Sequence, residues 1–125
     1  MIYGTGIDLV KISRMNESLN RTEGFAGRVF TPAEVAYSSS KAYPAQHFAA
    51  NFAVKEAFIK AFKMSLSNGM KFHDFELLHD ETGMPYIHLS GATKKLFDEK
   101  KLSAVHVSIS HDADYAIATI VIEGI

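Results

Sequence analysis

Glu56 and Lys60 stand four residues apart in the run NFAVKEAFIKAF, an otherwise apolar stretch that also contains Lys55. Residues four apart share one face of a helix, so a carboxylate and an ammonium group are expected side by side. A helix that is apolar on nearly all sides is usually buried, and burying an unpaired ion costs roughly several kcal/mol. These charged side chains therefore need either an ion-pair partner or a functional role. An intrahelical ion pair between Glu56 and Lys60 on a narrow solvated strip is the commoner arrangement, and a binding site is the alternative.

Two further segments place polar groups at the ends of apolar elements. Asp8 shares one face of the expected first strand with Gly4 and Gly6. Glycine inside a strand often marks the close approach of a ligand or of another backbone. Asp8 could equally cap the turn into the next helix. His111 ends a later strand, where a histidine is more often a turn residue than a catalyst.

The residue types indicate which chemistry such a site could support. Two carboxylates, Asp8 and Glu56, without cysteine or a histidine cluster suit a hard cation such as Mg²⁺, which prefers oxygen ligands and keeps waters or substrate phosphates. Lys60 would then face phosphate oxygens, and His111 could bind phosphate or take part in acid–base chemistry. Together these groups outline a site that handles a diphosphate.

Composition limits the class of protein. The chain has 125 residues, enough for one domain over 1–125, and its hydrophobic content of 47% is typical of a globular protein. No apolar run reaches the roughly 20 residues that a membrane span needs, and the N-terminus lacks the basic region of a signal peptide. With no cysteine and a net charge of -1, the chain is expected to be a cytoplasmic protein that binds neither nucleic acid nor membrane.

The periodicity predicts an α+β fold in which an antiparallel sheet packs on a long buried helix. Thr31-Pro32-Ala33-Glu34 is a capping box and predicts the start of a short helix that fades at residues 38–40. The other expected elements are a strand over 2–9, a helix over 13–20 capped by Ser13, the long helix over 45–64, a hairpin of strands 75–79 and 85–89, a helix from Ser90 to about 101, and a hairpin of strands 104–110 and 115–123.

Three blocks of the sequence resemble the signature motifs of the 4'-phosphopantetheinyl transferases. They are Ile7-Asp8-Leu9-Val10 with Arg14, Phe52 to Ala61, and Val107-Ser108-Ile109-Ser110-His111. Their order and spacing are similar to those of the holo-[acyl-carrier-protein] synthase branch, from Met1 to Glu123. The resemblance implies Mg²⁺-dependent transfer of phosphopantetheine from coenzyme A to a serine of apo acyl carrier protein, with release of adenosine 3',5'-bisphosphate.

The resemblance also implies roles for individual residues. Asp8 and Glu56 match the Mg²⁺ ligands of the family, and Glu56, Lys60 and His111 match its catalytic and phosphate-binding positions. Glu56 would deprotonate the serine directly or through a metal-bound water. Asn51 stands where family members commonly carry arginine. The residues expected to contact coenzyme A are Lys60, Lys63, Ser65, Ser67, Gly83, Pro85 and His111.

Partners follow from charge and from the resemblance. Arg14 and Arg21 concentrate positive charge near the N-terminus and are expected to dock the acidic carrier protein. The last strand offers small or apolar residues to both faces, as expected when one face meets a neighbouring chain. The family resemblance implies a homotrimer whose sites lie between subunits, with Asp8 and Glu56 from one chain and His111 from the next.

Two other functions use the same residues. A hydrolase would cleave the coenzyme A diphosphate with water, and a non-catalytic module would hold a nucleotide or a carrier protein. The second is disfavoured because a binder has little use for a costly buried carboxylate. Incubation with Mg²⁺, coenzyme A and apo carrier protein separates the three functions.

Overall fold

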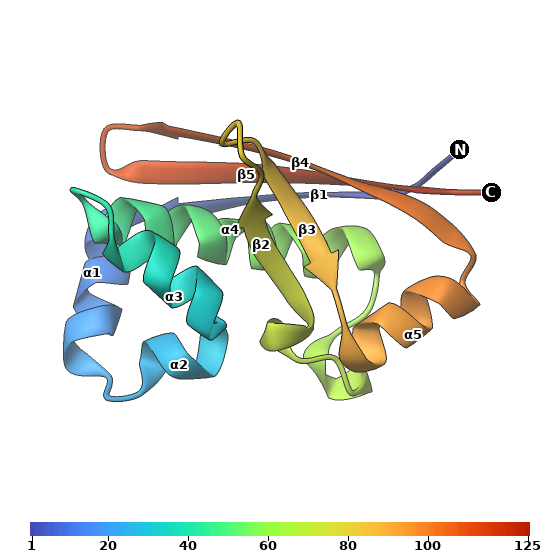
Figure 1. The fold of residues 1–125 in the computed structure, drawn as a ribbon, viewed down its shortest axis with the longest axis horizontal. Helices are drawn as coiled ribbons and strands as arrows, with labels where there is room; N and C mark the ends of the chain where they lie inside the picture. The colour runs from blue at the N-terminus through green and yellow to red at the C-terminus, as the bar shows by residue number, and fades with distance from the viewer.

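The main sheet has three antiparallel strands in the order β1 (Ile2–Lys11), β5 (Tyr115–Gly124) and β4 (Leu102–Asp112) in the computed structural model, which describes residues 1–125. The long helix α4 (Pro44–Phe62) packs across one face of this sheet. All helices lie on that same side, and no element covers the outer face of the sheet (Figure 1). The expected α+β class, with an antiparallel sheet on a long buried helix, is confirmed.

The remaining elements surround the face of α4 that points away from the sheet (Figure 1). Helices α1 and α3 pack against α4, and the hairpin of β2 and β3 reaches β4. In chain order these elements are α1 (Ile12–Arg21), α2 (Phe25–Val29), α3 (Pro32–Ser39), the 3-10 turns η1 (Leu66–Asn68) and η2 (Phe72–Asp74), β2 (Phe75–His79), β3 (Pro85–Leu89) and α5 (Gly91–Glu99). No helix is both long and apolar enough to cross a membrane.

The core consists of two hydrophobic clusters. Helix α4 is apolar on nearly all sides because it contributes side chains to both of them. Its C-terminal half packs Phe58 against Phe62 and Phe75, with ring centroids 5.4 and 4.7 Å apart. Its N-terminal half packs Phe48 against Phe30 of the second cluster, with ring centroids at 5.1 Å. Each fully buried aromatic side chain contributes roughly 1.5–3 kcal/mol through removal of apolar area from water.

Strand β1 touches the backbone of α4 at its two glycines. A Cβ atom at Gly4 would lie 2.0 Å from the carbonyl oxygen of Ala61, and one at Gly6 would lie 1.8 Å from that of Ala57. Any side chain at these positions would therefore push the strand off the helix. Of the two explanations for glycine inside a strand, the close approach of another backbone is the one that the structure shows.

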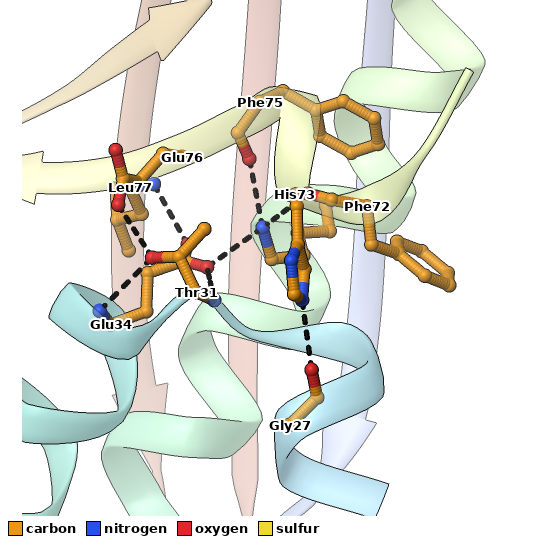
Figure 2. Close-up of polar contacts among 9 residues, drawn as sticks. Gly27, Thr31, Glu34, Phe72, His73, Phe75, Glu76 and Leu77 are labelled. Atoms are coloured by element: carbon orange, nitrogen blue, oxygen red, sulfur yellow. Dashed lines mark hydrogen bonds and ion pairs between the residues drawn. The ribbon is translucent and has the colours of Figure 1, made fainter. Parts of the chain in front are cut away.

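Lys55 is completely buried, and its ammonium group is fully paired. Its Nζ atom lies 3.0 Å from Oε1 of Glu34 and donates hydrogen bonds of 2.8 Å to the carbonyl oxygens of Phe72 and Phe75. Figure 2 labels these three partners around the unlabelled lysine. An ammonium group has three donors, so its hydrogen-bonding capacity is satisfied. Desolvation lowers the pKa of Lys55, and the Glu34 carboxylate opposes that effect.

The Glu34 carboxylate is satisfied in turn by backbone groups. Oε1 accepts the N–H of Thr31 at 2.9 Å, which closes the predicted capping box, and Oε2 accepts the N–H of Leu77 at 2.8 Å (Figure 2). The pair therefore fastens α3, α4 and β2 together. Removing one partner of such a pair costs about 3–5 kcal/mol, because the other charge stays buried.

The helix limits differ in detail from those expected. Ser13 is not the cap of α1, which begins at Ile12 without a side-chain cap; its hydroxyl donates instead to the Asp114 carboxylate at 2.6 Å. Ser90 precedes α5 but makes no capping hydrogen bond. Helix α4 ends at Phe62 because Lys63 is left-handed, with φ 63°. The short helix α2 was not predicted.

The last hairpin is longer than expected. β4 runs to Asp112, so His111 lies inside the strand, opposite Ala116, rather than in the turn. The turn consists of Ala113 and Asp114, and Ala113 takes φ 51°. The first hairpin, by contrast, has the predicted strand limits.

We expect Gly6→Ala to lower the free energy of unfolding by about 1–3 kcal/mol, because its Cβ has no room against the α4 backbone. Gly27→Ala is the matched control: nothing lies within 4 Å of a Cβ placed there, so within α2 it should be neutral or stabilising by up to about 1 kcal/mol. Urea denaturation of both variants measures the difference, and equal effects would contradict the close approach of β1 to α4.

Candidate functional site

Asp8, Lys60 and Glu56 come together at the open edge of β1, beside α4. The Lys60 ammonium group donates to the Asp8 carboxylate at 3.3 Å and to the carbonyl oxygen of Ile7 at 2.8 Å. Lys60 thus pairs across to the strand, and the intrahelical Glu56–Lys60 ion pair is not formed. Asp8 does not cap α1 either, since that helix has no side-chain cap. The two charged segments that the sequence singled out converge.

Glu56 has an unusual electrostatic environment for a half-buried carboxylate. Burial raises its pKa, the negative charge of Asp8 raises it further, and Lys60 partly offsets both effects. The site therefore holds two carboxylates for one lysine. An added cation would relieve the repulsion that raises the pKa of Glu56.

The donor set fits Mg²⁺ better than a soft or borderline metal. Nowhere do three or more histidine, cysteine, aspartate or glutamate side chains gather as a metal cluster. Two carboxylates on neighbouring elements are the kind of sparse oxygen set that Mg²⁺ uses, since it keeps several waters and takes substrate phosphates as further ligands. Asp8 and Glu56 are the residues that would hold it.

A cavity of about 380 Å³ lies on the other side of α4, among α3, the β2–β3 hairpin and β4. It brings together three residues expected to contact coenzyme A, namely Gly83, Pro85 and His111. Gly83 takes φ 87° in the hairpin turn, which favours glycine there.

The other expected coenzyme A contacts follow the C-terminal end of α4. Lys63 places its ammonium group 4.7 Å from the centre of the Tyr3 ring. The hydroxyls of Ser65 and Ser67 lie 2.5 Å apart, and the Asn68 side chain accepts from Ser65. None of these residues lines the cavity. The expected contacts therefore form two groups, one beyond Lys60 and one around His111.

Sheet order separates these two groups within one chain. Asp8 is on β1 and His111 on β4, with β5 between them. Adjacent strands are about 4.8 Å apart, so the two edge strands are separated by about 10 Å of sheet. His111 is thus not part of the group formed by Asp8, Glu56 and Lys60 in the same chain.

The two arginines expected to dock the carrier protein lie on α1. Arg14 and Arg21 are both exposed, and neither forms an ion pair within the chain. Arg21 is in the last turn of α1, where its charge also complements the helix dipole.

Tyr37, His47 and His79 are among the side chains of the cavity that the sequence did not single out. They come from α3, α4 and β2, so only the tertiary fold unites them. One local signal existed, because His47 and Asn51 stand four apart on α4 and therefore share a face.

Comparisons with known proteins agree over nearly the whole chain. Residues 4–120 match the family model described as the 4'-phosphopantetheinyl transferase superfamily. Holo-[acyl-carrier-protein] synthase of Geobacter sp. (strain M21) is 42% identical over 124 residues, which cover 98% of this chain and 99% of that protein.

Solved structures agree as well. The crystal structure of holo-[acyl-carrier-protein] synthase from Neisseria meningitidis matches with a TM-score of 0.89 and 33% identity, covering 98% of this chain and 99% of that one. The Helicobacter pylori holo-[acyl-carrier-protein] synthase in complex with coenzyme A matches with a TM-score of 0.83 and 32% identity, covering 95% and 99%.

The raised pKa of Glu56 has a measurable consequence for stability. The folded chain holds the proton of the Glu56 carboxyl group more tightly than the unfolded chain does. Stability of the fold therefore falls as pH rises from about 4.5 to the raised pKa, because Glu56 ionises more readily in the unfolded chain. Below about pH 4.5 this loss of stability is absent. Without metal, Glu56→Gln should therefore melt at a higher temperature than the parent chain at neutral pH, and the gap should close on acidification.

Thermal melts between pH 4 and 8 test this expectation. Glu17→Gln, on the exposed side of α1, is the control for the loss of one negative charge. A Glu56→Gln chain that melts lower than the parent at pH 7 would show that the carboxylate is stabilising and would contradict the electrostatic description of the site.

Proposed function

The chain belongs to the 4'-phosphopantetheinyl transferase superfamily, and we propose that it transfers phosphopantetheine from coenzyme A to a serine of apo acyl carrier protein. The observation that carries the proposal is the convergence of Asp8, Glu56 and Lys60 at one open edge. Two carboxylates and one lysine suit a diphosphate with its cation, and full-length similarity to holo-[acyl-carrier-protein] synthases supports the choice of substrates.

The transfer exchanges one phosphorus–oxygen bond for another. The serine oxygen bonds to the phosphorus that carries pantetheine, the bond from that phosphorus to the bridging oxygen breaks, and adenosine 3',5'-bisphosphate leaves with the electron pair. Such reactions depend mainly on positioning and on charge stabilisation. Mg²⁺ held by Asp8 and Glu56 would supply charge neutralisation at the diphosphate.

The residues of this chain supply the rest. Glu56 is the carboxylate that would take the proton that the serine loses, directly or through a water molecule. Lys60 presents a point charge to phosphate oxygens. Lys63, Ser65 and Ser67 continue the phosphate-binding surface beyond α4, while Gly83, Pro85 and His111 hold the nucleotide end.

Exposed apolar side chains on the sheet support a site assembled from two chains. Ile7 and Leu9 on the outer face of β1 are 54% and 58% exposed, although both are large and apolar. Covering that face with neighbouring subunits, in a homotrimer, buries these side chains. It also lets His111 of one subunit reach Asp8 and Glu56 of the next.

Arg14 and Arg21 give the carrier protein a docking surface on α1. Both arginines are exposed and free of intrachain ion pairs, so they can meet the acidic carrier. Contacts of this kind act mainly on association and its salt dependence.

One experiment tests the transferase function directly: the carrier protein is weighed after incubation with Mg²⁺ and coenzyme A. We expect the carrier to gain one phosphopantetheine, and Asp8→Ala to reduce the rate by at least roughly 100-fold. Asp98→Ala, which removes an exposed carboxylate paired with Lys94 on α5, is the control and should keep full activity. Cleaved coenzyme A with an unmodified carrier would identify a hydrolase, and two unchanged substrates would identify a binding module.

Mixing two inactive variants tests the shared site. Asp8→Ala and His111→Ala chains, each inactive alone, should recover roughly a quarter of the parent activity after subunit exchange, because each site needs one chain of each kind in a fixed order. Activity of the mixture and light scattering are measured on the same sample. A monomer at working concentration, or a mixed trimer without recovery, would refute the shared site.

A further inference from the structure

Three histidines face the cavity beside α4, each from a different element. His47 belongs to α4, His79 to β2 and His111 to β4. None of the fifteen residues that line the cavity is an aspartate or a glutamate. Protonated imidazoles would therefore have no carboxylate partner on the cavity wall, and an anion is the ligand that this wall can accommodate.

Aromatic contacts hold the imidazoles in place. The His79 ring stacks on Tyr37 with centroids 3.9 Å apart and planes inclined by 10°, and the His47 ring meets Tyr37 edge-on at 5.9 Å. The ammonium group of Lys41 lies 4.5 Å from the centre of the same Tyr37 ring. One tyrosine thus positions two imidazoles at the cavity and contacts an ammonium group whose charge acts on both of them.

Both imidazoles resist protonation in the ligand-free chain. Burial lowers the pKa of His47, and the charges of Lys41 and His111 lower it further. Burial likewise lowers the pKa of His79, helped by Lys41 and His47 and opposed by Asp80. The Asp80 carboxylate is engaged in the hairpin turn, where it accepts the N–H groups of Thr82 and Met84.

Asn51 supplies an independent sign that a ligand belongs here. Its side chain lines the same cavity, it is only 3% exposed, and its Oδ1 atom has no hydrogen-bond partner. Buried side-chain oxygens are nearly always paired. A ligand that carries an N–H or O–H donor beside its anionic group would satisfy this oxygen.

We propose that His47 and His79 bind a phosphate group of coenzyme A through imidazoles that are neutral in the free chain and protonated in the complex. The identity of the ligand rests on the proposed function. His47 and His79 thereby join Gly83, Pro85 and His111 as binding residues. They supply positive charge in a pocket where Asn51 offers none.

The direction of the pH dependence of binding follows from the negative charge of the phosphate. A bound phosphate favours the protonated imidazoles, so binding takes up protons from solution. Affinity therefore rises as pH falls through the range between the imidazole pKa values of the complex and of the free chain. Because phosphate monoesters themselves gain a proton near pH 6, the comparison belongs above about pH 6.5.

Calorimetry with coenzyme A, in two buffers of different ionisation enthalpy, measures the protons taken up on binding. We expect net uptake near pH 7 in the parent chain. His47→Gln and His79→Gln should each reduce the uptake and weaken binding by roughly tenfold at pH 6.5 but much less at pH 8.5. His79→Lys, which keeps a charge at every pH, should retain affinity and flatten the pH dependence. His88→Gln, exposed on β3 and outside the cavity, is the control.

The outcomes separate this proposal from the transferase function. Binding without proton uptake, or His79→Gln binding that is equally weak at every pH, overturns the proton-linked site and indicates packing alone. Carrier modification with no proton uptake leaves the transferase function standing and this proposal refuted. Proton uptake on coenzyme A binding without carrier modification supports the linked site and refutes the transferase.

Discussion

The contact between β1 and α4 sets the position of the proposed catalytic groups. Because Gly4 and Gly6 bring the strand down onto the helix carbonyls, the next residue on that face, Asp8, is held beside Lys60. The helix answers with small residues: Ala57 and Ala61 are completely buried against the strand. Because backbone meets backbone, no side chain lies between the two elements that could change its rotamer and alter their distance. The main chain itself therefore fixes the spacing between β1, which carries Asp8, and α4, which carries Glu56. Positioning of this kind is what phosphoryl transfer needs.

Helix α4 uses two consecutive charged residues for opposite purposes. Lys55 points inward to Glu34 and the β2 backbone, and Glu56 points to the open edge of β1. The contact with Gly4 and Gly6 holds the side of the helix that faces the sheet, and the buried ion pair holds the helix to α3 and β2. The hairpin held by the pair carries one wall of the cavity proposed to bind the nucleotide. Both halves of the proposed site therefore depend on the orientation of one helix.

Features encoded by neighbouring residues could be predicted from the sequence. The capping box at Thr31, the first hairpin and the apolar helix all depend on contacts within a few residues, and each was found. Asp8 and Glu56 were found because a costly charge in an apolar setting is conspicuous in a sequence. Their convergence with Lys60 could not be predicted, because it depends on the packing of β1 against α4.

Features that join distant segments could not be predicted. Lys55 pairs with a residue 21 positions earlier in the chain, and Ser13 bonds Asp114 across 101 positions. No local pattern distinguishes these side chains from exposed polar residues. The Tyr37–His79 stack is of the same kind, since each ring alone is typical of a half-exposed surface. The short helix α2 was missed because five residues are too few for a periodic signal.

The order of strands also bears on how the chain folds during synthesis. β1 pairs only with β5, as in the pairing of Ile2 with Glu123. The first strand therefore cannot join the sheet until the last strand has been synthesised. Until β5 leaves the ribosome, β1 has no strand partner to hold it against α4, and β4 is also an unpaired edge. Exposed apolar surface and free strand edges are what chaperones recognise and what aggregates. The nascent chain is therefore at its most vulnerable just before the ten residues of β5 appear, and loss of that strand removes both pairings of the three-stranded sheet rather than trimming it.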